Sequence, residues 1–226
     1  MTRPAQPDEA AQTATAGGGG EDPRAAELAK LMGRYCDGDA AAFHALYAAL
    51  APRILAYLAG LAGDKATAED LLQQTFMKLH QGRAAYVKGA NPAPWLYTIA
   101  HRTFLDETRR RKRARVRISA DGNLPHEPTV GISGSAEPET AAADDSTIAR
   151  GLEALATIPE PLRQAVLLTK IHGHSTAEAA AIAGISVGAL KVRAHRGYLA
   201  LRRKLGGGAG ESDPDRASDP KLAGAR

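Results

Sequence analysis

Apolar residues recur at steps of three and four along most of the chain, and this spacing places them on one face of an α-helix. The longest stripe follows Asp39, which suits a helix N-cap. Its members are Phe43, Leu46, Tyr47, Leu50, Ile54, Tyr57, Leu58 and Leu61. Shorter stripes lie in residues 24–36, in residues 70–81 and from residue 95 into residues 109–117. These stripes predict a helical domain over residues 24–114.

A second group of helices is predicted in residues 147–205. Ser175 and Glu178 have the spacing of a capping box, which marks a helix start. Gly184 then suits a tight turn, and Ser186 suits the N-cap of a final helix. Two helices joined by a short glycine turn are the pattern of a helix-turn-helix. We therefore predict an all-α chain with two small helical domains.

Three segments lack helical periodicity and are rich in Ala, Gly, Pro and Ser. They are residues 1–23, 115–146 and 206–226. Segments of this composition bury too little apolar surface to offset the entropy of ordering. We expect two disordered tails and one flexible linker between the domains.

The final helix has two chemically different sides. At about 100° per residue, the residues predicted to face inward are Val187, Leu190, Ala194, Tyr198, Leu201 and Leu205. The residues predicted to face outward, or to flank that face, are Gly188, Ala189, Lys191, Val192, Arg193, His195 and Arg196. The outward side is basic and carries no acid, so it suits the major groove of DNA.

Charge is strongly segregated, although the net charge is only +4. Residues 109–117 contain seven basic residues and no acid, and residues 179–210 contain no Asp or Glu. Such basic segments favour contact with phosphate groups. A single run could equally be a solvated surface, but two runs, one of them on a helix-turn-helix, favour nucleic acid.

Composition argues against several other classes of protein. The single Cys36 excludes an internal disulfide framework and a Cys-rich zinc site. His172 and His174 lack a third ligand at local spacing, so we interpret them as part of a polar turn. No apolar run approaches the roughly 20 residues that span a bilayer. We expect a cytoplasmic protein with no membrane insertion, no cofactor, no metal and no small-molecule substrate.

Residues 37–81 and 93–113 resemble the sigma-2 domain of extracytoplasmic-function sigma factors of the sigma-70 family. Residues 158–205 resemble their sigma-4 domain. Both halves occur in order with a linker between them, which makes the resemblance specific. It implies a protein that binds core RNA polymerase and directs it to start transcription at promoters. It also implies an anti-sigma factor as a partner.

The resemblance implies three sets of contact residues. Contacts with the clamp of the large core subunit would involve Asp70, Gln73, Gln74, Phe76 and Lys78, with Phe76 acting through helix packing. Recognition and melting of the promoter −10 element would involve Trp95, Tyr97, His101, Arg102, Arg109 and Arg110. Recognition of the −35 element would involve Ser186, Gly188, Ala189, Lys191, Val192, Arg193, His195 and Arg196. Trp95 near its helix start suits a core position equally well.

The chain departs from the family pattern at three of these positions. Arg102 stands where many members have Asn, and Arg cannot accept a hydrogen bond. Val192 replaces a small polar residue, so it suits contact with a thymine methyl group. Ala189 replaces a common Thr. These departures mean that the resemblance does not predict which promoter sequence the chain recognises.

Two rival interpretations are weighed against this one. The sequence GISVG at residues 184–188 matches the Gly-x-Ser-x-Gly nucleophile elbow of hydrolases. That motif needs a preceding strand and a histidine downstream of an acid, and neither is predicted, so we expect no enzyme. The second rival is a helix-turn-helix regulator that acts without core polymerase. Co-purification with core polymerase would distinguish it.

Overall fold

The computed structural model describes residues 23–120, 151 and 153–205, and all regular structure in these ranges is helical. The first group of helices comprises α2 (Pro23–Cys36), α3 (Ala40–Ala62), α4 (Lys65–Gly82), the short η1 (Arg83–Ala85) and α5 (Pro92–Ala120). The second group comprises α7 (Glu160–Val166), the π-helical turn η2 (Leu167–Ile171), α8 (Thr176–Ala183) and α9 (Val187–Lys204). The all-α prediction is confirmed for the described residues.

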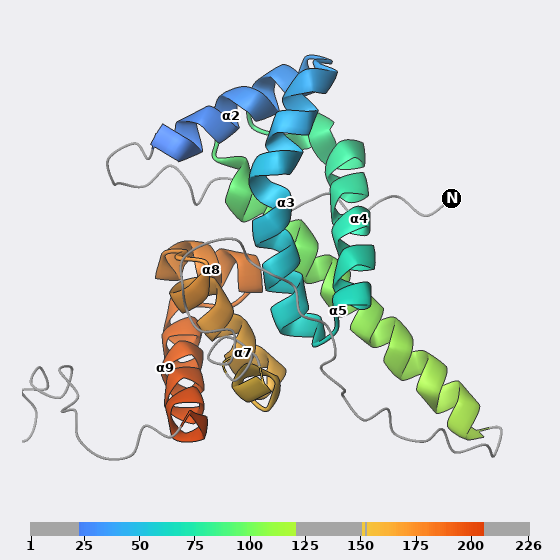
Figure 1. Ribbon diagram of the computed structural model, residues 1–226, viewed down its shortest axis with the longest axis vertical. Coiled ribbons are helices and arrows are strands. Elements are labelled where there is room, and N and C mark those ends of the chain that lie inside the picture. Colours follow the sequence, from blue (N-terminus) through green and yellow to red (C-terminus); the bar gives the residue numbers. More distant parts are fainter. Residues whose placement is uncertain (1–22, 121–150, 152, 206–226) are drawn as a thin grey trace, which may run out of the picture.

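The expected tails and most of the expected linker lie outside the described residues. One boundary differs, because α5 continues to Ala120 and therefore includes the first six residues of the predicted linker, 115–120. The C-terminal part of α5 projects away from the other helices (Figure 1). The helix therefore runs through the whole basic segment, residues 109–117.

Helix α3 is the central element of the first group, and it packs against α2, α4 and α5. The Asp39 carboxylate accepts hydrogen bonds from the backbone N–H groups of Ala41 and Ala42 and so caps its start. Gly63 ends it in the left-handed conformation, with φ 79°. Its inward side is filled by large apolar residues that are almost completely buried, among them Leu46, Leu50, Ile54, Tyr57, Leu58 and Leu61.

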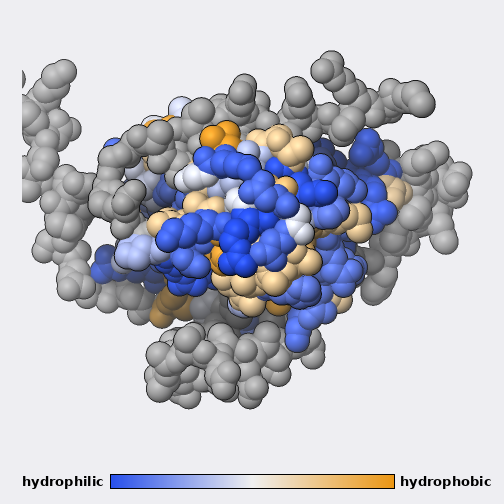
Figure 2. All heavy atoms as spheres, turned by 90° about the horizontal axis from the view of Figure 1, so that it is seen from above, coloured by the Kyte–Doolittle hydropathy of each residue, from blue (hydrophilic) through white to orange (hydrophobic). Residues whose placement is uncertain are grey.

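Helix α3 is also long and apolar enough to cross a membrane by length and composition. This contradicts our expectation that no segment approaches that length. Its buried side, however, is the core of the first helical group. Seen from above, hydrophilic residues dominate the described surface, with pale orange apolar areas between them (Figure 2). An apolar helix packed at the centre of a bundle accounts for its composition.

The second group forms the predicted helix-turn-helix. The Ser175–Glu178 capping box is present at the start of α8, with Ser175 N donating to a Glu178 carboxylate oxygen at 2.9 Å. Gly184 has φ 65° and ends α8. The Ser186 hydroxyl then accepts a hydrogen bond from Ala189 N at 3.2 Å and caps α9. These local signals fix the turn that orients α9.

The two helical groups are in contact and share one hydrophobic core. Helix α8 packs on α5, and the α7–η2 segment packs on α3 (Figure 1). Residues from both groups, such as Leu96 and Leu168, are fully buried in that core. The arrangement is therefore more compact than two domains that a flexible linker keeps apart.

Candidate nucleic-acid interface

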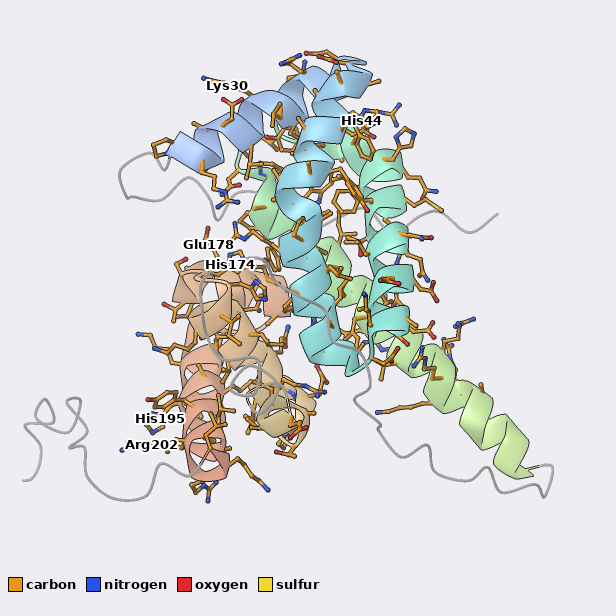
Figure 3. The ribbon with its side chains drawn as sticks, viewed as in Figure 1. Lys30, His44, His174, Glu178, His195 and Arg202 are labelled. Carbon is orange, nitrogen blue, oxygen red and sulfur yellow. The ribbon has the colours of Figure 1, made fainter. Side chains whose placement is uncertain are left out.

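The outer side of α9 carries the sequence-predicted polar residues. Lys191, His195 and Arg196 are exposed, as is Val192 with 49 % of its surface accessible. His195 and, near the C-terminal end of the helix, Arg202 point away from α7 (Figure 3). The smaller members of the predicted set lie at the N-terminal end, where Ser186 and Gly188 are exposed and Ala189 is half-buried. Arg193 is also half-buried.

The inner side of α9 differs from the sequence prediction. Leu190 is fully buried, but Val187, Tyr198 and Leu205 are 42 %, 48 % and 39 % exposed. The buried position that periodicity missed is Gly197. A Cβ placed there would lie 2.8 Å from the Leu162 carbonyl oxygen. The close approach of α7 at this glycine sets which side of α9 faces inward.

The exposed side of α4 carries four polar residues of the predicted core-polymerase set. They are Asp70, Gln73, Gln74 and Lys78. Phe76 is instead 5 % exposed, and its ring packs against Tyr47 at a centroid distance of 4.6 Å. Met77, which sequence reasoning did not select, is 59 % exposed and follows Gln73 by four residues, so it shares that side of the helix. The sequence could have indicated it, because Met77 is an apolar residue that lies outside the buried stripe of this helix.

Helix α5 separates the predicted −10 residues into two groups. Arg102, Arg109 and Arg110 are exposed. Trp95, Tyr97 and His101 are almost completely buried, at 2 %, 0 % and 4 % exposure. The Trp95 ring stacks on Tyr86 at 5.9 Å, which is the core position that the sequence also allowed. The structure therefore leaves the cations of this set exposed and covers its aromatic and imidazole groups.

The basic end of α5 is partly neutralised by acids of the same helix. Glu107 accepts hydrogen bonds from Arg110 Nε and Arg111 Nε, both at 2.8 Å. These bonds lower the pKa of the Glu107 carboxyl below its usual range. Arg109 pairs with Asp106 at 3.6 Å. Exposed ion pairs of this kind contribute little stability, so phosphate groups can replace the carboxylates as partners.

The rival site chemistries do not fit the described residues. Ser186 lies between α8 and α9 as a helix N-cap, whereas a nucleophile elbow requires a strand before the serine. The described ranges contain no group of three or more His, Cys, Asp or Glu residues that could hold a metal ion. The described exposed surfaces of α9 and α5 are suited to binding an anionic polymer.

Comparison with known proteins identifies the family. Residues 46–114 match sigma-70 region 2, and residues 151–201 match sigma-70 region 4. The chain is 40 % identical over 178 residues to the RNA polymerase sigma factor CarQ of Myxococcus xanthus, covering 77 % of this chain and 95 % of CarQ. It is 35 % identical to the ECF RNA polymerase sigma factor SigF of Caulobacter vibrioides, covering 79 % and 93 %. The chain belongs to the extracytoplasmic-function (ECF) sigma factors.

Solved structures support the same fold for this ECF sigma factor. The sigma factor RpoE of Bartonella quintana, solved with the anti-sigma factor NepR, is similar with a TM-score of 0.61 and 28 % identity. The match covers 72 % of this chain and 96 % of RpoE. CnrH, solved with the cytosolic domain of CnrY, shares the fold with a TM-score of 0.59 and 21 % identity, covering 81 % and 99 %.

Membership of the ECF sigma factors establishes the general role. The chain directs RNA polymerase in transcription initiation, which implies core RNA polymerase as its partner. It is not an enzyme, because the polymerase carries out the chemistry. The rival assignment as a regulator without core polymerase is wrong, since region 2 is present together with region 4.

Proposed function

We propose that the two regions read separate promoter elements, with α9 reading the −35 element as duplex and α5 reading and opening the −10 element. The observation that carries this proposal is the acid-free outer side of α9, which is capped by Ser186 and exposed to solvent. Two elements 17–20 base pairs apart are separated by about 60 Å at 3.4 Å per step. Two bodies on one chain suit such a span, because the first contact raises the effective concentration of the second.

On α9, the chemistry of each side chain suggests its role. Gly188 and Ala189 are small, so the helix backbone can approach base edges closely. Lys191 and Arg196 can donate to guanine or to phosphate, and Val192 can contact a thymine methyl group. We assign phosphate or groove contacts to the remaining members of the set, which are Ser186, Arg193 and His195.

Arg196→Ala is expected to weaken −35 recognition. One lost base or phosphate contact of this kind reduces promoter affinity by roughly tenfold. The measurement is run-off transcription and footprinting by holoenzyme on a promoter that contains a −35 element. Lys170→Ala is the matched control, because it removes one exposed cation from the same region outside α9. Equal footprints for both variants would contradict the assignment.

On α5, the exposed Arg102, Arg109 and Arg110 are assigned to the displaced strand of the −10 element. Cations hold single-stranded backbone, and planar groups stack on unpaired bases. Trp95, Tyr97 and His101 could supply planar groups, but only after the packing that covers them has opened.

On α4, the exposed polar side is assigned to the clamp of the large core subunit. Its residues are Asp70, Gln73, Gln74 and Lys78, with Phe76 holding the helix in place from inside. Combined Gln73→Ala and Gln74→Ala should reduce competition with wild type for core enzyme. Circular dichroism should remain unchanged because both side chains are exposed. Undiminished competition would refute the docking surface.

We also propose an anti-sigma factor as a regulatory partner and a cytoplasmic location, where core polymerase acts. The support is the similarity to RpoE, which was solved bound to the anti-sigma factor NepR. The test is purification of the chain from its own cells, followed by transcription assays with each co-purifying protein. If none of those proteins inhibits transcription, this proposal fails.

A further inference from the structure

We infer that the groove between α7 and α9 binds an acidic segment of this same chain, residues 211–215, and that the bound segment competes with DNA for Arg196. The binding itself does not depend on the proposed function. The competition does, because Arg196 belongs to the set that we assign to the −35 element.

The groove lies between the start of α7 and the C-terminal half of α9, two helices that pack side by side (Figure 1). Its volume is about 580 Å³. Its apolar floor consists of Pro159 and Leu162 from the α7 side and of Leu199 and Ala200 from α9. The Leu199 side chain is 41 % exposed. An apolar group of a bound segment would therefore find a surface on which to pack.

The rim of the groove is basic and consists of Arg196, Arg202 and Arg203. Arg196 and Arg203 are exposed, and the half-buried Arg202 lies at the outer edge, pointing away from α7 (Figure 3). No acid lines the groove. Within the described ranges none of these three arginines forms an ion pair, whereas the arginines of α5 pair with Asp106 and Glu107. The positive charge of the groove is therefore left for another partner.

The helix dipole accounts for only part of this charge. Cations in the last turn of a helix are stabilised by its partial negative end, which suits Arg202 and Arg203. Arg196 lies about two turns before the end of α9, beyond the reach of that effect. The dipole also gives no reason for an exposed apolar floor beside the arginines. An anionic partner with an apolar group accounts for both features.

The residues that follow α9 have the chemistry of such a partner. Residues 206–226 lie outside the described part of the chain, and their sequence contains ESDPD at residues 211–215. This acidic segment carries the carboxylates of Glu211, Asp213 and Asp215 and no basic residue. Arginine clusters recognise acidic motifs through charge-assisted hydrogen bonds. Pro214, between two of the carboxylates, matches the apolar floor.

The acidic segment is attached closely enough to reach every arginine of the rim. Arg196 lies nine residues before Leu205, which is about 14 Å along the helix. The six residues from Gly206 to Glu211 can span up to about 20 Å. So short a connection gives an effective concentration of about millimolar. Exposed ion pairs, although individually weak, are sufficient to hold the segment at that concentration.

Binding of the acidic segment controls access to the −35 surface. Arg196 cannot contact DNA and the segment at the same time. A chain that binds DNA only after release of the segment has an apparent dissociation constant raised by the inverse of its released fraction. A segment bound for about nine-tenths of the time thus weakens −35 binding about tenfold.

Two matched variants separate this competition from a general effect of charge. The neutral variant combines Glu211→Gln, Asp213→Asn and Asp215→Asn. The control variant removes equal charge from residues 121–150, by combining Glu127→Gln, Glu137→Gln and Glu139→Gln. A general electrostatic gain in DNA binding is the same in both variants, whereas the acidic segment is lost only in the neutral one.

Binding of the segment is measured without DNA, by NMR on the full chain. A nitroxide attached at Ser212→Cys in a Cys36→Ala background should broaden the amide signals of Leu162 and Arg196. The signals should recover in the neutral variant, whose connection to α9 has the same length, and should stay broad in the control variant. Arg203→Glu repels the carboxylates and should release the segment as well. Signals that are sharp in wild type, or equally broad in wild type and the neutral variant, overturn the inference.

The competition is measured as affinity of the free chain for a duplex taken from a promoter that holoenzyme transcribes. The neutral variant should bind about tenfold more tightly than the control variant. Added salt should reduce this difference, because it screens the ion pairs of the segment. Equal affinities of the two variants overturn the competition. If the segment binds by NMR but neither holoenzyme nor free chain binds −35 DNA, the proposed function fails and the bound segment stands.

Discussion

At the scale of single residues, we propose that Arg102 determines the −10 sequence preference of this chain. It lies on the exposed side of α5, directly after the buried His101. Its guanidinium can stack on a base and donate hydrogen bonds, but it cannot accept one. A base with an acceptor edge, such as guanine, therefore suits this position better than a base that presents a donor.

Arg102→Asn is expected to change the −10 preference while leaving the −35 preference intact. Asn can both donate and accept, so discrimination at one base should change by roughly tenfold. The measurement is selection of transcribed promoters from a pool randomised across the −10 element. Arg113→Asn, an equal loss of charge at an exposed site of the same helix, serves as the control. Identical preferences in wild type and Arg102→Asn would show that this residue reads no base.

Sequence reasoning placed the polar residues of α9 well and its apolar residues poorly. Lys191, His195 and Arg196 are exposed as predicted. Tyr198 and Val187 were predicted to face inward, but both are largely exposed. Periodicity identifies an apolar stripe but cannot reveal that a backbone approaches at a residue without a side chain, which is what happens at Gly197.

At the scale of helices, packing within region 4 depends on that same glycine. A Cβ at Gly197 would meet Val166 Cγ2 at 2.7 Å and the Leu162 carbonyl oxygen at 2.8 Å. The backbone contact cannot be relieved by a rotamer change. The approach of α9 to α7 therefore requires glycine here.

Gly197→Ala is expected to lower the free energy of unfolding by about 1–3 kcal/mol, the usual effect of overpacking. Gly188→Ala in the same helix meets nothing within 4 Å. It should raise the free energy of unfolding by up to about 1 kcal/mol through helix propensity. Urea titration followed by circular dichroism measures both. Stabilisation by Gly197→Ala would contradict the close approach of the two helices.

Helix ends were predictable where a cap lies in the local sequence. Asp39, Ser175 and Ser186 all cap helices as expected. Helix α4 is capped by Asp64, whose carboxylate accepts a hydrogen bond from Thr67 N at 2.7 Å.

At the scale of the whole molecule, the packing of region 4 on region 2 determines which groups can reach DNA. Composition predicted two domains and a linker but gave no sign that the domains touch. The contact depends on groups more than 60 residues apart in the chain, such as His101 and Gln164. Local patterns carry no information on such pairings.

The packing of region 4 on region 2 is expected to weaken in acid. Burial lowers the pKa of His101, His172 and His174 to about 4. In a chain whose two regions have separated, these groups titrate near 6.5. The separated form therefore binds more protons between those values, so the contact between the regions is strongest above about pH 6.5 and weakens as the pH falls toward 4. The groups that face this cluster are Arg53, Tyr57, Tyr97, Arg102, Glu160, Gln164 and Glu178.

Scattering measured at pH 7 and pH 5 tests this dependence on the full chain. The radius of gyration should increase at pH 5 in wild type and in His44→Gln, which changes an exposed histidine. The increase should be smaller in His101→Gln, because one buried titrating group is gone. An unchanged radius of gyration in wild type between these pH values would contradict the prediction.

The most direct measurement of the central claim is transcription in vitro with purified core RNA polymerase and a library of genomic templates. With this chain added, transcripts should start at a set of promoters that share two elements at a fixed separation of about 17–20 base pairs. Core enzyme alone should start none of them. No new start sites on adding the chain, or start sites that share no such pair of elements, would contradict the account.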